Sequence, residues 1–229
     1  MADAIEKIII VVGFDQKESI AYHVFCQSII EKSSLPVYFI PLVEKGLAHN
    51  FPKQSDGSNK FIYSRFLTPF LNNYSGWSIF ADGDMICQAD IKELWNLRDE
   101  SKAVMVVKHD YKTKAPIKYQ GNKNENYPRK NWSSLILWNC GHKDNKILTP
   151  EFVNLQTGSF LHRFSWLDDS LIGELDKAWN WLAIEYPENY QAKLVHYTLG
   201  TPCFKNYSNS SMSDLWKNFY ALTQDGIDI

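Results

Sequence analysis

The sequence has few cysteines: its 229 residues contain four, and these lie far apart. No two of them form the C-x-x-C pair on which zinc ribbons and thioredoxin-like redox sites depend. A chain of this length can bury a sizeable core without disulfides, so a disulfide framework is not expected. Reduced cysteines are typical of the cytosol, and we therefore expect a cytoplasmic location.

Long apolar runs are absent as well. Residues 8–12 form an apolar run of only five residues, whereas a membrane-spanning helix needs about 18 or more. The first residues include Asp3 and Glu6, where a secretory signal peptide would carry basic residues. We expect no transmembrane segment, while peripheral contact with a membrane stays open.

The chain also lacks a strong net charge. Its 24 basic and 26 acidic side chains give a net charge of −2, so no overall electrostatic field attracts nucleic acid. Hydrophobic residues make up 45% and charged residues 22%, which excludes a disordered chain or a coiled coil. The length favours one large domain over two small ones, and we expect a single domain over residues 1–229.

The balanced total hides an uneven distribution of charge. Between residues 102 and 130, eight lysines and arginines stand against Asp110 and Glu125, so this window carries +6 and the remainder −8. Residues 108–130, here called the basic insertion, are too long and polar for a simple connection. We interpret them as a flap that faces a diphosphate or an anionic acceptor, or alternatively as a solvated insertion.

Hydrophobic patterning predicts an α/β fold. Strands are expected at residues 8–12, 37–40, 77–81, 103–107, 135–138 and 194–197. Helices are expected at 17–32, 61–71 (bent or ended by Pro69), 91–97, from about 150, and at 213–222 before a tail to 229, with a loop at 44–60. Asp90 and Thr149 are expected to mark the starts of the helices at 91 and 150. The opening β-α-β order and the β-branched first strand predict a mainly parallel, buried sheet.

The strongest chemical signal is Asp82-Gly83-Asp84, which directly follows the expected strand at 77–81. In extended backbone both carboxylates project to the same side, and α/β sheets bind ligands at the carboxyl ends of their strands. Gly83 allows close approach of a ligand. Carboxylate oxygens suit Mg²⁺ or Mn²⁺, so the motif predicts a metal site; the alternative is a turn with two solvated acids.

Five segments in order resemble the retaining family 8 glycosyltransferases. They are residues 63–69 (an arginine-bearing helix), 77–85 (a strand followed by D-x-D), 131–139 (a segment beside the donor sugar), 166–171 with 179–180 (an acidic helix start and a W-N pair) and 196–200 (a histidine motif). The resemblance covers most of residues 8–205. It implies the GT-A fold, a Rossmann-like three-layer α/β/α sandwich with a mainly parallel central sheet.

The resemblance also implies an activity. A sugar would move from a nucleotide-diphosphate sugar, expected to be a UDP-sugar, to a glycan, lipid-linked glycan or other hydroxyl acceptor, with retention. Asp82, Asp84 and His196 would hold a divalent ion, and the imidazole shifts the preference from Mg²⁺ toward Mn²⁺. The ion would stabilise charge on the departing nucleotide. A purely structural His196 is the alternative.

Further roles follow from the same resemblance. The residues implied to bind the nucleotide sugar are Gly13, Asp15, Ser64, Arg65, Gly83, Asn139, Gly200 and Lys205. Arg65 would pair with phosphate or orient the first aspartate, or else form a surface salt bridge. Asp15 would contact the nucleotide or else cap a helix.

Asp168 and Asp169 are the acids expected beside the reacting carbon. A carboxyl group there would stabilise the developing charge or orient hydroxyl groups, and no covalent nucleophile is assigned. Retaining transfer on one face of the sugar, with the leaving phosphate taking the acceptor proton, fits this interpretation. A helix-capping role for Asp168 is the alternative.

The histidine motif departs from the family pattern. The family places glycine three residues after the histidine and then a lysine-proline-tryptophan run that grips the diphosphate. Here Gly200 stands four residues after His196, and Thr201-Pro202-Cys203-Phe204-Lys205 follows. The lysine that contacts the diphosphate is therefore either Lys205 or a lysine of the basic insertion.

Two other functions compete with glycosyl transfer. A phosphatase of the haloacid dehalogenase type also uses D-x-D after an apolar strand, here Asp82 and Asp84. That motif belongs to the first strand, however, whereas β-α-β material precedes it in this sequence. A non-catalytic sugar-nucleotide-binding protein is the other alternative, although it has no need to keep both metal-binding acids.

Overall fold

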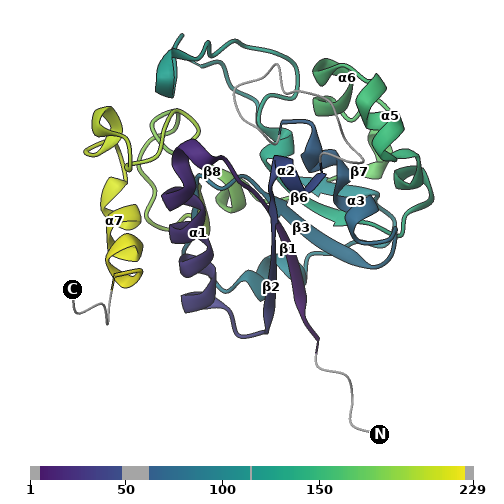
Figure 1. Ribbon diagram of the computed structural model, residues 1–229, viewed down its shortest axis with the longest axis horizontal. Coiled ribbons are helices and arrows are strands. Elements are labelled where there is room, and N and C mark those ends of the chain that lie inside the picture. Colours follow the sequence, from purple (N-terminus) through teal and green to yellow (C-terminus); the bar gives the residue numbers. More distant parts are fainter. Residues whose placement is uncertain (1–5, 48–61, 114, 225–229) are drawn as a thin grey trace, which may run out of the picture.

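The computed structural model describes residues 6–47, 62–113 and 115–224. Its centre is a six-stranded sheet in the order β2-β1-β3-β6-β5-β7 (Figure 1). The strands are β1 (Ile8–Gly13), β2 (Val37–Leu42), β3 (Trp77–Ala81), β5 (Val104–Val106), β6 (Leu135–Asn139) and β7 (Ile172–Glu174). Within this sheet only β6 runs antiparallel to its neighbours, so the predicted mainly parallel sheet is confirmed.

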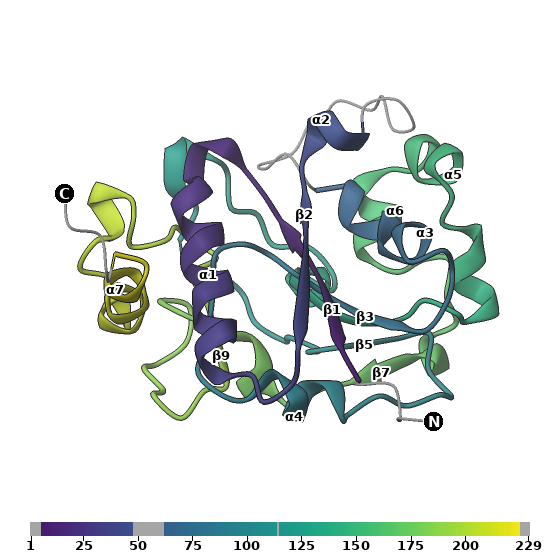
Figure 2. The same cartoon turned by 60° about the horizontal axis from the view of Figure 1, so that its bottom comes forward.

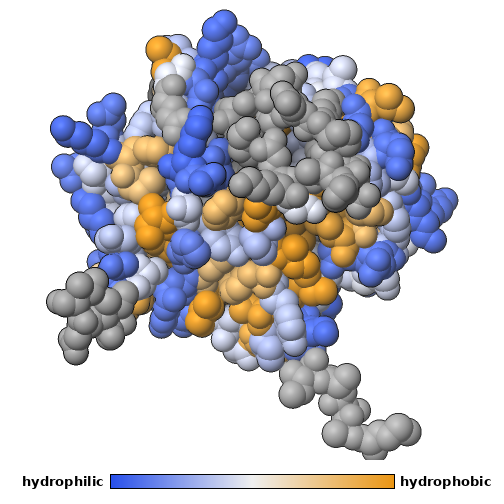
Figure 3. All heavy atoms as spheres, in the orientation of Figure 1, coloured by the Kyte–Doolittle hydropathy of each residue, from blue (hydrophilic) through white to orange (hydrophobic). Residues whose placement is uncertain are grey.

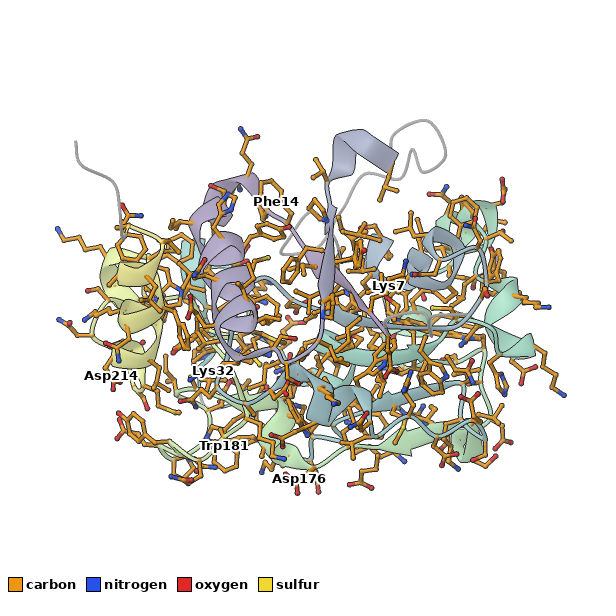
Figure 4. The ribbon with its side chains drawn as sticks, turned by 90° about the horizontal axis from the view of Figure 1, so that it is seen from below. Lys7, Phe14, Lys32, Asp176, Trp181 and Asp214 are labelled. Atoms are coloured by element: carbon orange, nitrogen blue, oxygen red, sulfur yellow. The ribbon has the colours of Figure 1, made fainter. Side chains whose placement is uncertain are left out.

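Helices cover both faces of the sheet, as Figure 2 shows. One side carries α1 (Ser19–Lys32), α4 (Ile91–Trp95) and α7 (Ser213–Leu222). The other carries α3 (Thr68–Leu71), α5 (Pro150–Leu155) and α6 (Gly158–His162), while α2 (Glu44–Leu47) follows β2. Figure 4 shows α7, which bears Asp214, on the far side of α1 from the sheet. This is the predicted three-layer α/β/α arrangement.

Alternation of side chains along the strands divides the core into two parts. Ile8 and Ile10 of β1 pack in one cluster with Phe25 of α1. Val11 points to the opposite face and packs in a second cluster with Phe66. The β-branched run is therefore buried on both faces, which is why it shows no polar alternation.

A second, three-stranded sheet has the order β4-β9-β8. Its strands are β4 (Met85–Cys87), β9 (Leu194–His196) and β8 (Trp181–Leu182). Antiparallel pairing of β4 with β9 places Met85 opposite His196, so a residue late in the chain arrives beside the D-x-D motif. The strand predicted near residue 194 is confirmed, whereas β4 and β8 are too short for sequence patterning to reveal.

Local capping signals identify two helix starts correctly. The Asp90 side chain accepts a hydrogen bond from Lys92 N at the start of α4, and Thr149 caps α5 in the same way. The single helix predicted at 61–71 is wrong: a 3-10 helix at Ser64–Leu67 leads into α3. Pro69 lies in the first turn of α3, where its missing N–H is tolerated, so it starts this helix and does not end it. Of the predicted loop at 44–60, the first four residues form α2 and the rest lies outside the described residues.

The edge strand β2 is only partly buried. Tyr38 is 54% exposed, and Figure 3 shows hydrophobic residues gathered over β1 and β2. The Lys7 ammonium lies 5.0 Å from the centre of the Tyr38 ring, and a cation at this edge disfavours pairing with another sheet. No helix in the described part of the chain is long and apolar enough to cross a bilayer.

The second core cluster generates a stability prediction. Trp138 of β6 is fully buried and stacks on Trp166, with 6.3 Å between the ring centres. Trp138→Ala should lower the free energy of unfolding by about 3–5 kcal/mol, because it leaves a cavity in the core. Urea unfolding measures the change, and Leu155→Ala, at a side chain that is 82% exposed, should alter it by less than about 0.5 kcal/mol. Equal midpoints for the two variants would contradict this account of the core.

Candidate active site

Asp82, Asp84 and His196 meet at the carboxyl end of β3. The three residues each offer one ligand atom, and these atoms lie within 4.8 Å of one another. The main chain of the motif is held from two sides, because Asp82 N donates to Ser134 O and Tyr197 N donates to Asp84 O, both at 2.9 Å. Two carboxylates and an imidazole form a donor set for a divalent cation.

Arg65 holds the first aspartate. Its Nη1 lies 3.0 Å from Asp82 Oδ1 and donates to Ser133 O at 2.9 Å, and the residue is only 4% exposed. Burial raises the pKa of Asp82 to about 6, although Arg65 opposes the shift. The surface salt bridge considered for Arg65 is wrong, because the pair is buried.

His196 is held in one orientation by a chain of buried groups. His196 Nδ1 and Asn180 Oδ1 are 3.0 Å apart, and Asn180 Nδ2 donates to Ser134 Oγ at 2.8 Å. Since the amide oxygen only accepts, Nδ1 carries a proton, and Nε2 is the nitrogen that faces Asp84. Nε2 lies 3.2 Å from Asp84 Oδ1. Burial raises the pKa of Asp84, but the charge of His196 and its hydrogen bond outweigh this effect, so the pKa falls below its usual value.

Gly83 is required by close packing of two strand ends. A Cβ at this position would lie 2.4 Å from Gly13 O, much closer than nonbonded atoms approach. Gly13 and Gly83 line a small hollow together with Asp15, Glu18 and Tyr22. The ends of β1 and β3, which were predicted to face the nucleotide, are therefore in contact.

A cavity of about 410 Å³ opens beside the three candidate ligands. Arg65, Asp82, Asp84 and His196 line one part of it. Another part is lined by α6 and by residues of the basic insertion. In Figure 1 the insertion is the teal segment that crosses the top of the molecule, and hydrophilic side chains cover this region in Figure 3.

Tyr119 fastens the basic insertion above the site. Its N–H donates to Leu199 O at 2.7 Å, and its ring stacks on Phe204 with 5.1 Å between the ring centres. Its hydroxyl also hydrogen-bonds to Glu18. One tyrosine thus connects the insertion to the end of β1 and to the segment after His196.

A family comparison agrees with this geometry. The sequence profile of "Glycosyl transferase family 8" matches residues 7–142, which include Arg65 and both aspartates. The chain belongs to glycosyl transferase family 8. It is also 46% identical over 219 residues to "Protein CDI" of Arabidopsis thaliana, covering 91% of this chain and 84% of that protein. As a family 8 member the protein is a glycosyltransferase, as predicted, and the phosphatase alternative does not fit.

Solved glycosyltransferases share the fold. The "WbbM bifunctional" enzyme aligns with a TM-score of 0.67 and 14% identity, over 94% of this chain and 50% of that one. GlyE of Streptococcus pneumoniae TIGR4 aligns with a TM-score of 0.63 and 12% identity, over 93% of this chain and 60% of that one. LgtC, a galactosyltransferase in complex with donor and acceptor sugar analogues, aligns with a TM-score of 0.59 and 10% identity, over 94% of this chain and 96% of that one. The chain thus spans only half to three fifths of WbbM and GlyE, and these likenesses establish the GT-A fold alone.

A lysine of the basic insertion lies near Asp82 and Asp84. Lys118 lines the cavity, and the charges of Asp84 and Asp82 act on it, while burial lowers its pKa. Lys205 is exposed and lines a separate hollow of about 350 Å³, to which Lys118 also contributes. A Cβ at Gly200 would lie 2.6 Å from the Tyr207 ring, so this glycine is needed for packing. The placement favours Lys118 over Lys205 as the lysine that faces a diphosphate.

Asn139 lies at the amino end of β3, whereas the site lies at the carboxyl end of that strand. It pairs with Trp77 at the start of β3, and its side chain donates to Lys102 O at 3.2 Å. Because β6 runs antiparallel to β3, its first residues face the site and its last residues do not. A donor contact for Asn139 does not fit this position.

Asp168 and Asp169 are not brought into the cavity. Both are exposed and precede β7. Because β7 runs in the same direction as β3, its carboxyl end lies on the side of Asp82, and the two acids before its amino end lie on the other side. Asp168 caps a 3-10 helix by accepting from Ser170 N at 2.8 Å, as the alternative interpretation held. Asp169 Oδ1 lies 2.6 Å from Arg129 Nη2. The placement does not fit contact with the reacting carbon.

Two other predicted residues have structural partners near the site. Asp15 is buried and caps a 3-10 helix, accepting from Lys17 N at 3.0 Å, while it lines the hollow beside Gly13. Ser64 is buried at the start of the 3-10 helix that carries Arg65. The cap considered for Asp15 is therefore present, and a nucleotide contact for either residue stays a prediction.

Sequence reasoning missed the wall formed by α6. His162 and Arg163 line the cavity, and Ser133 Oγ lies 2.6 Å from His162 Nδ1. The helix has five residues and too little periodicity to be recognised, so no pattern pointed to it. Asn180, in the W-N pair, was noticed only as part of the resemblance, without its role beside His196.

Glu18 generates a prediction on pH. Burial, assisted by Asp84 and other nearby acids, raises the pKa of this carboxyl group to about 8. The folded protein therefore holds a proton that the unfolded chain releases near pH 4.5, and stability contributed by this group falls as pH rises from about 4.5 to 8. Glu18→Gln, which mimics the protonated acid, should raise the melting temperature progressively over this range in EDTA. A difference from the unmodified protein that is the same at pH 5 and pH 8 would contradict this.

Proposed function

We propose that the protein transfers a sugar from a UDP-sugar to a hydroxyl acceptor, with retention, and that the reaction depends on a divalent metal. The observation that carries the proposal is the Asp82, Asp84 and His196 cluster, which lines the 410 Å³ cavity at the carboxyl end of β3, where α/β sheets bind ligands. Membership of family 8 and the GT-A fold support it.

The three residues fit a metal ion. Apart from the ion pairs to Arg65 and His196, the buried Oδ1 atoms of Asp82 and Asp84 have no hydrogen-bond partner in the described part of the chain. Buried acceptors of this kind are costly without a cation. Two carboxylates with one imidazole favour Mn²⁺, and Mg²⁺ is the alternative. When bound, the ion supplies positive charge that stabilises the departing nucleoside diphosphate.

The remaining charges near the cluster suit the diphosphate. Lys118 and Arg65 both line the cavity, and Arg65 is paired with Asp82. Ammonium and guanidinium groups bind phosphate oxygens well, so Lys118 is the proposed diphosphate ligand and Arg65 keeps Asp82 ionised and oriented. Gly13 and Asp15 remain the proposed contacts for the ribose and base.

The acids of the cavity favour a reaction without a covalent enzyme intermediate. In the described part of its lining, the acids are Asp82, Asp84 and Glu125, of which the first two are assigned to the metal. Glu125 is exposed on the basic insertion. We infer that the acceptor hydroxyl attacks on the face from which the diphosphate leaves, and that a phosphate oxygen takes its proton. Asp169 then acts by holding Arg129 and not at the reacting carbon.

The acceptor class and the location remain part of the proposal. A glycan or lipid-linked glycan suits a cavity that is open to solvent and lined by polar groups. All four cysteines are free, which favours the cytoplasm, and a peripheral membrane contact is compatible with a lipid-linked acceptor.

Thermal stability in the presence of nucleotide sugars tests the proposal. A UDP-sugar with Mn²⁺ at a hundred times its Kd should stabilise the fold by about 2.7 kcal/mol, a rise in Tm of about 5–10 °C. EDTA should abolish the rise, and GDP-, CDP- and dTDP-sugars should give smaller ones. Asp84→Asn should lose the Mn²⁺-dependent rise, whereas Asp214→Asn on α7 should keep it. If no nucleotide sugar raises Tm and EDTA has no effect, the proposed function is wrong.

Asn180 provides a separate test of the metal site. Asn180→Ala removes the acceptor that fixes His196, so Mn²⁺ affinity should fall about 10–100-fold. Titration of Mn²⁺ followed by electron paramagnetic resonance measures the affinity, and Asn218→Ala, at an exposed asparagine of α7, is the control. Melting in EDTA shows whether the variant folds. An unchanged Kd in a folded Asn180→Ala protein would exclude this role.

A further inference from the structure

The cavity has a second charged region apart from the metal cluster. Its wall consists of α6 with the adjoining Arg163, and of the end of the basic insertion. Three cations line this region, Lys123, Lys130 and Arg163, against one acid, Glu125. This set of four residues is here called the basic end of the cavity.

Lys130 is a buried, hydrogen-bonded part of this wall. It is only 6% exposed, and its Nζ donates to Asn124 Oδ1 at 2.5 Å and to Glu125 O at 2.7 Å. Both acceptors are uncharged groups, and among the described residues no carboxylate forms an ion pair with this ammonium. Burial lowers the pKa of Lys130, and the acids that act on it are Glu185 and Glu125, not the two aspartates of the metal site.

Arg163 is also short of a counter-ion. Its Nε is buried and has no hydrogen-bond partner within the described residues, and the described residues hold no ion pair to its guanidinium. Its main-chain oxygen accepts from Arg129 Nη1 at 2.6 Å, and Arg129 is paired with Asp169. The position of Arg163 is thus fixed by a chain that starts at an exposed acid.

His162 adds a neutral polar group between the two regions. Burial and the charges of Arg65 and Lys118 lower the pKa of His162 to about 3, so it is uncharged at neutral pH. Its Nε2 is buried without a partner in the described part of the chain, whereas Nδ1 faces Ser133 Oγ. A neutral imidazole of this kind suits a sugar hydroxyl better than an anion.

The diphosphate does not account for the basic end. The proposed metal, Arg65 and Lys118 already balance the two aspartates and the diphosphate of an intact nucleotide sugar. Lys130 is buried and the Nε atom of Arg163 is buried, and such groups without paired acids are unfavourable unless a ligand supplies the negative charge. The positive charge of Lys123, Lys130 and Arg163 is therefore available to a second, anionic substrate.

We propose that the basic end binds a phosphate or carboxylate group of the acceptor, so that the enzyme glycosylates an anionic hydroxyl compound. This inference rests on the proposed function, because it assigns the acceptor of the same reaction. Arg163 and Lys123 would contact the anionic group, Lys130 would hold the wall in place, and His162 would contact an acceptor hydroxyl.

Calorimetric titration of the full chain saturated with UDP and Mn²⁺ tests the inference. The probes are glucose, glucose 6-phosphate and glucuronic acid, which differ in the charged group, together with glycerol and glycerol 3-phosphate. At least one anionic probe should bind about tenfold or more tightly than its neutral parent, and added salt should weaken it. Comparison of the phosphate and carboxylate probes identifies the preferred group.

Variants locate the binding site. Arg163→Gln and Lys123→Gln should each weaken the anionic probe about tenfold, with the affinity for UDP and Mn²⁺ unchanged. Lys146→Gln, at an exposed lysine outside the cavity, should change neither. If neutral probes bind as well as anionic ones, if no anionic probe binds, or if Lys146→Gln has the same effect as Arg163→Gln, the inference is wrong. Failure of UDP and Mn²⁺ to bind at all would instead overturn the proposed function.

Discussion

The burial of two carboxylates at one edge of the sheet is the constraint on which the site depends. Asp82 is 8% exposed, and Asp84 stands two residues away on the same strand end. Two carboxylates this close together and this well shielded from water are unfavourable unless positive charge surrounds them. Arg65 and His196 supply part of that charge from two different segments of the chain. The divalent cation that we propose would complete the balance, so the arrangement of these four side chains and the proposed metal site answer one electrostatic requirement.

Local rules were sufficient where a short stretch decides its own structure. The run at 8–12 was correctly assigned to a buried strand because β-branched residues fill both faces of a parallel sheet. Asp90 and Thr149 were correct as helix starts because a cap acts within three residues. Asp82 and Asp84 were correctly expected to lie close together because they are two residues apart, although the segment that links β3 to β4 bends at residues 83 and 84 and is not the extended strand that was expected.

Whether two strands pair in parallel or antiparallel could not be derived from such local rules. Asn139 follows an apolar strand just as Asp82 does, yet β6 runs antiparallel and carries Asn139 to the other edge. The same reasoning explains Asp168 and Asp169, which precede a strand and were placed from the resemblance alone. His196 was found only through the resemblance, because the register of β4 with β9, which is a long-range property, positions it.

The basic insertion gives the near-neutral total charge its physical meaning. Three of its lysines, Lys118, Lys123 and Lys130, line the same cavity as Asp82 and Asp84. The insertion is held at its middle by the hydrogen bond from Tyr119 to Leu199, and near its end by the ion pair of Arg129 with Asp169. Anything that binds between the insertion and the sheet must therefore satisfy both sets of charges at once. The proposed nucleotide sugar with its metal would meet the requirement near Asp82, and the positive charge of the basic end would then select the second substrate, as we propose above.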